Sequence, residues 1–185
     1  AGYIKPALSS LSEVLLRKLT EERIEHGEAK TFGTPRRLSL RVANISTKQK
    51  PLTIEIIGPP EKVGFDSNGQ PTMAGRKFAE KMGIPLKAIC IKQTEKGRYL
   101  CAVKTETGLE SRAVLTKLLP EVIASVPFPK VMKWGDLDIR FARPIQSVLA
   151  LLGKQVVPFE AGNIKSGRYT FGHRFLSAGK IKISH

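Results

Sequence analysis

Cysteine and histidine are scarce in this chain of 185 residues, which contains two cysteines and three histidines. Cys90 and Cys101 do not form a Cys-x-x-Cys pair, and the histidines are scattered along the sequence. Neither a zinc site nor a disulfide framework is therefore indicated, and we assign no metal ligand. Two reduced thiols, buried or half-buried, are the expected state.

Long apolar runs are also missing. None approaches the roughly 20 residues that a membrane-spanning helix needs, and no charged leader with an apolar stretch and a cleavage site opens the chain. We expect no membrane partner and a cytoplasmic location. The chain opens on Ala1 instead of a methionine and ends within a strand-like pattern, so we interpret it as a fragment of a longer protein.

The common motifs of nucleotide and hydrolytic chemistry are absent as well. The sequence has no Gly-x-x-x-x-Gly-Lys-Ser/Thr loop, no Gly-x-Gly-x-x-Gly turn and no Gly-x-Ser-x-Gly elbow. Asp136 and Asp138 are the one close pair of acids in the basic regions, and a general acid and base or a magnesium site is one interpretation. Turn acids that orient Lys133 or Arg140 are the favoured one, so we assign no catalytic residue and no cofactor to this chain.

Positive charge is what the chain has in excess. Lysine and arginine number 31 against 16 acids, which gives a net charge of +15 and a pI near 10.1. Residues 35–54 carry five cations and no acid, residues 129–185 carry ten cations against three acids, and no acid follows Glu160. Blocks of one sign can form a face, so a phosphate-bearing partner is expected, with an ordinary solvated surface as the alternative.

Apolar spacing predicts helices over 6–25, about 72–82 and 111–126, the last with Pro120 inside it, which should kink or split it. Strands are predicted over 36–45 and 52–57, and hairpins over 88–105 and 145–159, the latter turning at Gly153-Lys154. Helices and strands mix without βαβ alternation. This predicts an α+β fold with mixed or antiparallel sheets and a few packed helices, in one unit or two lobes.

Two proline-rich joints, 58–60 and 127–129, predict the domain organisation. The main α+β unit would comprise 1–60 and 128–185. A helix–hairpin–helix lobe over 61–127 would be inserted into it.

Three arginine-bearing phrases hold cations next to apolar or aromatic neighbours. In the alternation that begins at residue 36, Arg36 shares the parity of the leucines, so a structural ion pair with Glu55, or a loop carbonyl, is its expected partner. Trp134 is a candidate for stacking on a base, and core filling is the alternative. The candidate nucleic-acid-binding residues are Arg37, Arg41, Lys130, Lys133, Arg140, Arg143 and Arg174.

The same phrases carry a family resemblance. Thr34-Pro-Arg-Arg-Leu, Gly58-Pro with the 65–72 loop, Pro129-Lys-Val-Met-Lys-Trp-Gly135, Phe141-Ala-Arg-Pro-Ile145 and Gly172-His-Arg-Phe175 occur in order along nearly the whole chain. Together they resemble the N-terminal region of the beta subunit of the bacterial heterotetrameric glycyl-tRNA synthetase.

That resemblance implies membership of a glycine–tRNA ligase, an aminoacyl-tRNA synthetase that joins glycine to tRNA(Gly). ATP and magnesium would be bound by the alpha subunit, and this chain would be a non-catalytic part with a basic surface for tRNA, for the alpha subunit, or for both. A stand-alone RNA-binding or ribosome-associated module is the alternative. An editing-type hydrolytic domain is the second, although no nucleophile–base pair for it is evident in the sequence.

Overall fold

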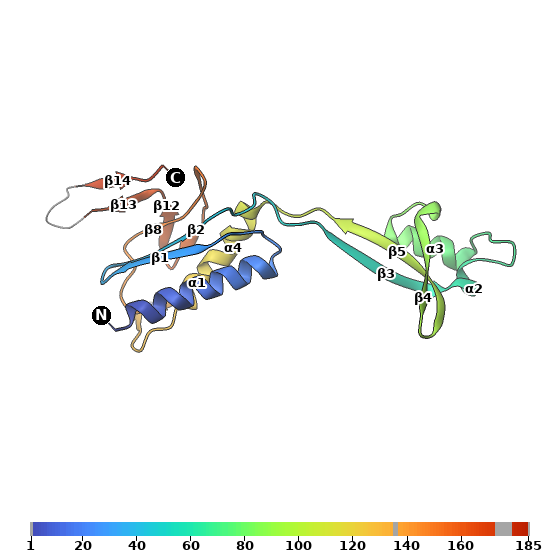
Figure 1. Ribbon diagram of the computed structural model, residues 1–185, viewed down its shortest axis with the longest axis horizontal. Helices are drawn as coiled ribbons and strands as arrows, with labels where there is room; N and C mark the ends of the chain where they lie inside the picture. The colour runs from blue at the N-terminus through green and yellow to red at the C-terminus, as the bar shows by residue number, and fades with distance from the viewer. Residues whose placement is uncertain (1, 135–136, 173–178, 185) are drawn as a thin grey trace. The chain divides into compact units, whose positions relative to one another are not determined.

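The chain folds into two compact units (Figure 1). The structure is a computed structural model that describes residues 2–134, 137–172 and 179–184, with the backbone alone at 134 and 137–139. Unit 1 comprises Ala1–Lys50 and Leu109–His185, and unit 2 comprises Pro51–Gly108. Helices combined with small, mainly antiparallel sheets confirm the predicted α+β class.

Unit 1 begins with helix α1, Ile4–Glu21. Pro6 lies in the first turn, where backbone N–H groups have no intrahelical acceptor. The N–H that proline lacks therefore costs the helix no hydrogen bond. The helix ends earlier than predicted because Arg23 adopts a left-handed conformation (φ 55°) and the Ile24 N–H returns to the carbonyl of Leu19 at 2.8 Å. The residues that α1 buries follow helical spacing: Ala7, Leu8, Leu15 and Leu19.

An antiparallel hairpin follows, made of β1 (Ala29–Thr34) and β2 (Arg37–Val42). One of its faces packs on α1. Gly33 permits that approach, because a Cβ at this position would lie 2.7 Å from side-chain atoms of Ile4 and Leu8. The opposite face of the hairpin is left open to solvent.

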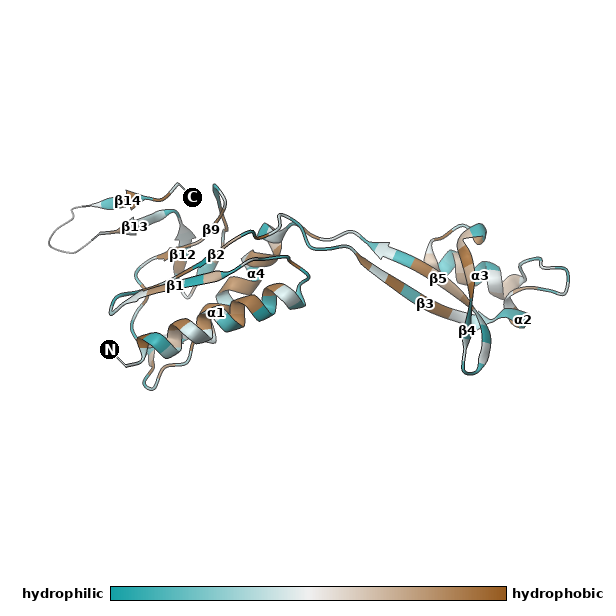
Figure 2. Cartoon of the chain, viewed as in Figure 1, coloured by the Kyte–Doolittle hydropathy of each residue, from teal (hydrophilic) through white to brown (hydrophobic). Residues whose placement is uncertain are grey.

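After unit 2 the chain returns to unit 1 in α4, Ser111–Ala124, which packs against α1. Figure 2 shows apolar residues along both helices. The helix runs through Pro120 without splitting, because Leu118 and Val122 on either side of it are buried in the shared core. The buried members of that core are Leu15, Leu19, Ile24, Val114, Leu115, Leu118, Val122, Val157, Phe159 and Ala161.

Short strands complete unit 1. Antiparallel pairs join β6 to β7, β9 to β10, β11 to β12 and β13 to β14, whereas β12 and β8 are parallel. The predicted turn at Gly153 connects β9 to β10, with φ 57° at the glycine. The bounds are β6 Met132–Trp134, β7 Leu137–Phe141, β8 Val148–Leu149, β9 Leu151–Leu152, β10 Gln155–Val156, β11 Glu160–Ala161, β12 Ile164–Gly167, β13 Tyr169–Phe171 and β14 Lys180–Lys182.

A hydrogen-bonded clasp joins the two stretches of unit 1 where the chain leaves for unit 2 and returns. The side-chain amide of Gln49 donates to the Glu22 carbonyl and carboxylate at 2.9 and 2.8 Å, and its oxygen accepts from the Leu109 N–H at 3.0 Å. The backbones of Gln49 and Leu109 are also bonded, at 2.9 Å. Gln49 is buried, and both polar atoms of its side chain are hydrogen-bonded inside the protein.

Unit 2 is a three-stranded antiparallel sheet in the order β3-β5-β4, with a helix on one face. Phe78 of α3 packs with Leu100 and Ala102 of β5, and Gly58 leaves room for the Phe78 ring. The predicted helix that stops at Gly83 (φ 65°) is confirmed, as is the 88–105 hairpin. The bounds are β3 Leu52–Pro60, α2 Glu61–Gly64, α3 Met73–Met82, a 3-10 turn Leu86–Ala88, β4 Ile89–Thr94 and β5 Gly97–Glu106.

The sequence predicts an inserted lobe over 61–127, and unit 2 covers 51–108. Residues 52–60 lie in unit 2 because β3 pairs with β5. Helix α4 lies in unit 1 because it packs on α1. The proline-rich joints at 58–60 and 127–129 therefore fall inside the units and not between them.

Candidate nucleic-acid interface

The open face of the β1–β2 hairpin gathers cations through its register. Residues directly opposite on antiparallel strands project from the same face, and the pairs on this side are Lys30 with Arg41, Phe32 with Ser39, and Thr34 with Arg37. The alternate residues, including Leu38 and Leu40, face α1. We call the solvent side the basic face: Lys30, Phe32, Thr34, Arg37, Ser39 and Arg41.

Lys30 and Arg41 form a pair of like charges at the end of this face away from the turn. Both are exposed, and neither has an ion-pair partner in the described part of the chain. Like charges directly opposite on a sheet repel each other. An anion that bridges them would relieve this repulsion, and phosphate oxygens suit both side chains.

Arg37 connects the basic face to the strand β13. Its guanidinium donates a short hydrogen bond to the carbonyl oxygen of Phe171. A guanidinium has five N–H donors, and Arg37 is exposed, so this bond leaves other donors available. Arg37 thus holds β2 and β13 together and still presents charge to solvent.

The β6–β7 hairpin brings together two further predicted cations. Lys133 and Arg140 are directly opposite each other and exposed. Lys130 and Arg143 lie just outside the hairpin and are also exposed. Close to it, the Phe128 ring packs edge-on against Phe141, with centroids 4.6 Å apart, and against Tyr3 at 6.1 Å.

Three of the sequence predictions cannot be placed or are placed differently. Arg174 lies outside the described residues, as does the side chain of Trp134. The parity expected for Arg36 is wrong, because Pro35 and Arg36 form the turn between the strands and alternation starts only at Arg37. Arg36 is exposed, and Glu55, its suggested partner, is hydrogen-bonded to Lys92. The ion-pair role of Arg36 stays a prediction.

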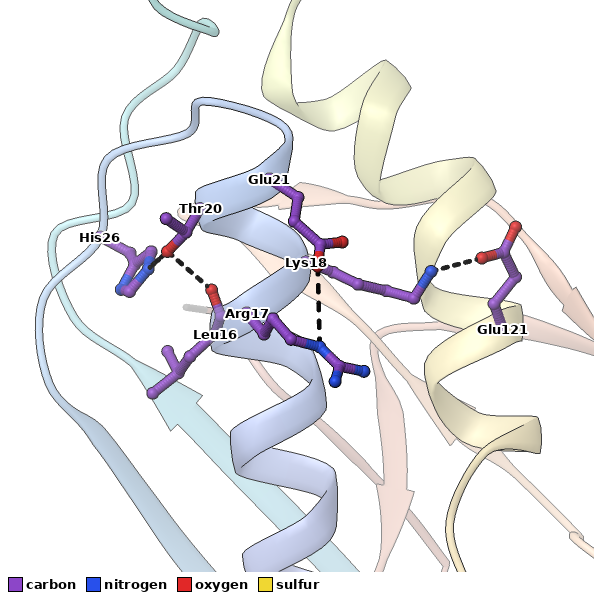
Figure 3. A network of polar contacts seen from close by, with 7 residues as sticks. All are labelled: Leu16, Arg17, Lys18, Thr20, Glu21, His26 and Glu121. Carbon is purple, nitrogen blue, oxygen red and sulfur yellow. Dashed lines mark hydrogen bonds and ion pairs between the residues drawn. The ribbon is translucent and has the colours of Figure 1, made fainter.

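Cations on the helical side of unit 1 differ from those of the basic face, since several are paired with acids (Figure 3). Lys18 of α1 reaches Glu121 of α4 at 2.7 Å, and Arg17 lies 3.7 Å from Glu21 one turn along the helix. The hydroxyl of Thr20 bonds the His26 ring at 3.1 Å. The charges on this side largely balance each other, which makes it a weaker anion surface.

In unit 2, acids likewise pair with cations. Glu55 hydrogen-bonds Lys92 and raises the pKa of that amine above its usual value. Arg98 lies 2.9 Å from Glu61. Burial raises the pKa of the Cys101 thiol. The hydrogen bond with Cys90, on the neighbouring strand, also raises this pKa.

Sequence reasoning missed several residues of the open faces: Lys30, Phe32 and Tyr169. Lys30 and Phe32 alternate with Thr31 and Gly33, and this period-2 pattern was the available signal. Tyr169 is part of a three-residue strand, too short for any periodicity to indicate. Its partner strand β14 starts eleven residues after it, so local spacing could not reveal the pairing.

The described residues offer neither a metal-binding cluster nor a membrane-spanning helix. No cluster of three or more histidine, cysteine, aspartate or glutamate side chains there could hold a metal ion. No helix there is both long and apolar enough to cross a bilayer.

Comparison with known proteins gives consistent matches along the chain. The family of the glycyl-tRNA synthetase beta subunit matches residues 1–185. A relative from Desulforapulum autotrophicum, named glycine–tRNA ligase beta subunit, is 49% identical over 183 residues, 99% of this chain and 27% of the relative. A protein of the same name from Desulfatibacillum aliphaticivorans is 46% identical over 183 residues, which are 99% of this chain and 26% of that relative. A third, from Desulforamulus reducens, is 42% identical over 185 residues, which are 100% of this chain and 27% of that relative. The chain thus spans about a quarter of the length of these relatives.

Proposed function

Because the chain belongs to the glycyl-tRNA synthetase beta subunit family, we propose that it is a non-catalytic part of a glycine–tRNA ligase and that its basic face binds the backbone of tRNA. The observation that carries the proposal is the pair Lys30 and Arg41, directly opposite and without acidic partners among the described residues. Backbone phosphates are the anions that a cell offers in such arrays, and their contacts position an RNA without reading its sequence.

Arg37 supports the same proposal from the edge of the face, where its remaining donors point to solvent. The β6–β7 cations Lys130, Lys133, Arg140 and Arg143 extend the surface in the proposal. Assembly with the alpha subunit is the other role considered for these charges. A protein partner would have to supply acidic groups to the basic face.

ATP and magnesium are assigned in this proposal to the alpha subunit, and the cytoplasm remains the expected location. The described residues of this chain include no group of side chains that could hold a metal ion. The isolated chain is expected to show only background glycine-dependent exchange of pyrophosphate into ATP. Activity that disappears with Asp136→Asn and Asp138→Asn would contradict the non-catalytic role.

Binding of tRNA to the 185-residue chain, measured between about 50 and 200 mM salt, tests the basic face. The double variant Lys30→Gln with Arg41→Gln should bind more weakly, and its salt dependence should fall by about one phosphate contact per cation removed. The matched control, Lys87→Gln with Lys96→Gln, removes the same charge from exposed positions of unit 2. A flat salt response of the parent, or equal losses in both double variants, would contradict the proposal.

The alternative functions predict other results. A stand-alone RNA-binding module would bind tRNA without ever associating with the alpha subunit, which co-purification would reveal. An editing-type domain would hydrolyse mischarged tRNA.

A further inference from the structure

The two-stranded β13–β14 sheet has one face of unusual composition. Tyr169 lies directly opposite Lys182, and Phe171 lies directly opposite Lys180. Directly opposed residues share a face, so two aromatic rings and two lysines project together, while Thr170 and Ile181 take the other side. We call this face the aromatic–lysine platform: Tyr169, Phe171, Lys180 and Lys182.

The platform is open to solvent. Tyr169 is 49% exposed and Phe171 45%, and both lysines are exposed. Among the described residues, neither lysine has an ion-pair partner. A soluble protein usually buries its large aromatic side chains, so two exposed rings on alternate residues of one strand indicate a binding surface.

Part of the platform borders a shallow hollow of about 230 Å³. Tyr169, Phe171 and Lys180 line it together with Gln146 and Ser147. The hollow therefore combines two aromatic rings and a cation with an amide and a hydroxyl, which can donate and accept hydrogen bonds.

We propose that the aromatic–lysine platform binds unpaired nucleotides of RNA, by stacking bases on Tyr169 and Phe171 while Lys180 and Lys182 contact the adjacent phosphates. Aromatic side chains interleaved with cations are the chemistry that recognises single strands, because every base has a face to stack and every nucleotide a phosphate. The inference rests on the proposed function, that unit 1 binds tRNA, and adds which part of an RNA this site takes.

The spacing of the rings fits this ligand. Alternate residues on a strand are about 7 Å apart, and stacked bases are separated by about 3.4 Å. The separation of the two side chains along the strand is thus about twice the stacking distance. This is the separation expected when one base is stacked between the two rings. Bases of a duplex are stacked on each other and cannot enter such a site, so the platform requires an unpaired stretch.

The basic face and the platform divide the recognition of RNA between them. Arg37 joins the two surfaces through its hydrogen bond to the Phe171 carbonyl. The basic face presents charge with one exposed ring, Phe32, whereas the platform pairs each ring with a lysine. A duplex would engage the first surface, and an adjoining unpaired segment the second.

The test compares two RNA probes on the 185-residue chain: an unstructured strand of about eight nucleotides, within the site size of such surfaces, and a hairpin with a long stem. The double variant Tyr169→Leu with Phe171→Leu should bind the single strand about 5- to 100-fold more weakly, with an unchanged salt slope. Its affinity for the hairpin stem should change little. Lys180→Gln with Lys182→Gln should instead lower the salt slope for the single strand.

Two controls separate stacking from loss of structure. Tyr169→Phe with Phe171→Tyr keeps both rings and should keep binding, and thermal melts show whether the leucine variant is folded. Equal losses for both probes, or no loss for either, would overturn the platform while leaving the basic face intact. If no RNA binds the parent chain, the proposed function fails first. Capture of an acidic peptide by the platform in preference to the single strand would assign it to a protein partner and overturn the inference.

Discussion

At the scale of single residues, Arg37 and Arg41 have different surroundings although both project from β2. Arg37 donates to the Phe171 carbonyl, and Arg41 has no partner among the described residues. A side chain that holds two strands together contributes to folding, whereas an unpaired one on an open face does not. Substitution of Arg37 should therefore lower the stability of the protein, whereas substitution of Arg41 should not.

We expect Arg37→Ala to lower the free energy of unfolding by about 0.5–1.5 kcal/mol, the usual value of one hydrogen bond. Arg41→Ala and Arg36→Ala should unfold like the parent, because both side chains are exposed and unbonded in the described structure. Urea titration of the three variants measures this. A marked loss with Arg36→Ala alone would restore the structural ion pair that the sequence suggested.

The two cysteines differ in reactivity. Cys90 is exposed and Cys101 is buried, and burial raises the pKa of the Cys101 thiol. A raised pKa keeps this thiol protonated at pH 8, so the reactive thiolate is depleted in the folded state. We expect an alkylating reagent at pH 8 to modify Cys90 at least about tenfold faster than Cys101.

Mass spectrometry of the digested chain gives both rates, with Cys90→Ser and Cys101→Ser as controls. In denaturant the two thiols should react alike. Equal rates without denaturant would show that the β4–β5 pair opens readily and that Cys101 is not protected.

At the scale of the elements, α4 keeps a proline that its sequence does not favour. Pro120 cannot donate to the carbonyl of Thr116, four residues earlier, yet the helix continues to Ala124. Burial of Leu118 and Val122 against α1 outweighs this local cost.

Pro120→Ala should therefore stabilise the chain, by about 1–3 kcal/mol, since alanine restores the helical hydrogen bond and has the best helix propensity. Differential scanning calorimetry of the variant against the parent measures the change. A control in the same core is Leu19→Ala, which should lose about 2–5 kcal/mol because Leu19 is fully buried. A lower melting temperature for Pro120→Ala would mean that the proline is fitted into the core and not merely tolerated.

Elements with strong local signals were predictable from the sequence. Gly83 in a left-handed conformation ends α3, and the β4–β5 turn follows its Glu95-Lys96 signal. The end of α1 was not predictable, because Arg23, a residue type without a turn preference, adopts the left-handed conformation there. The platform was beyond reach too, since tertiary pairing of β13 with β14 creates it.

At the scale of the whole chain, the Gln49 clasp makes unit 2 separable. The residues that flank the insertion, Gln49 and Leu109, are hydrogen-bonded to each other within unit 1. The ends of the inserted segment thus lie close together, which is the condition for tolerated insertions and deletions.

Replacing residues 51–108 by a short Gly/Ser linker should leave unit 1 folded and its affinity for tRNA nearly unchanged, because the basic face and the α1–α4 core lie outside the deleted segment. Circular dichroism and the salt titration of tRNA binding measure both properties. As a control, Gln49→Ala in the intact chain should cost about 1–3 kcal/mol, since it removes the hydrogen bonds of this side chain to Glu22 and Leu109. Loss of tRNA binding on deletion would place binding residues in unit 2.

The insertion that the Gln49 clasp closes also determines the order in which the two units can fold during synthesis. Helix α1 ends at Glu21, and its partner α4 is complete only at Ala124, 103 residues later (124 − 21). At about 5–20 residues per second, the apolar stripe of α1 is without this partner for roughly 5–21 seconds. Unit 2 is contiguous, so it can fold during that interval, ahead of the unit that begins before it. Within these residues the usual N-to-C order of folding is therefore inverted, and Leu15 and Leu19 are accessible to chaperones until α4 has been made.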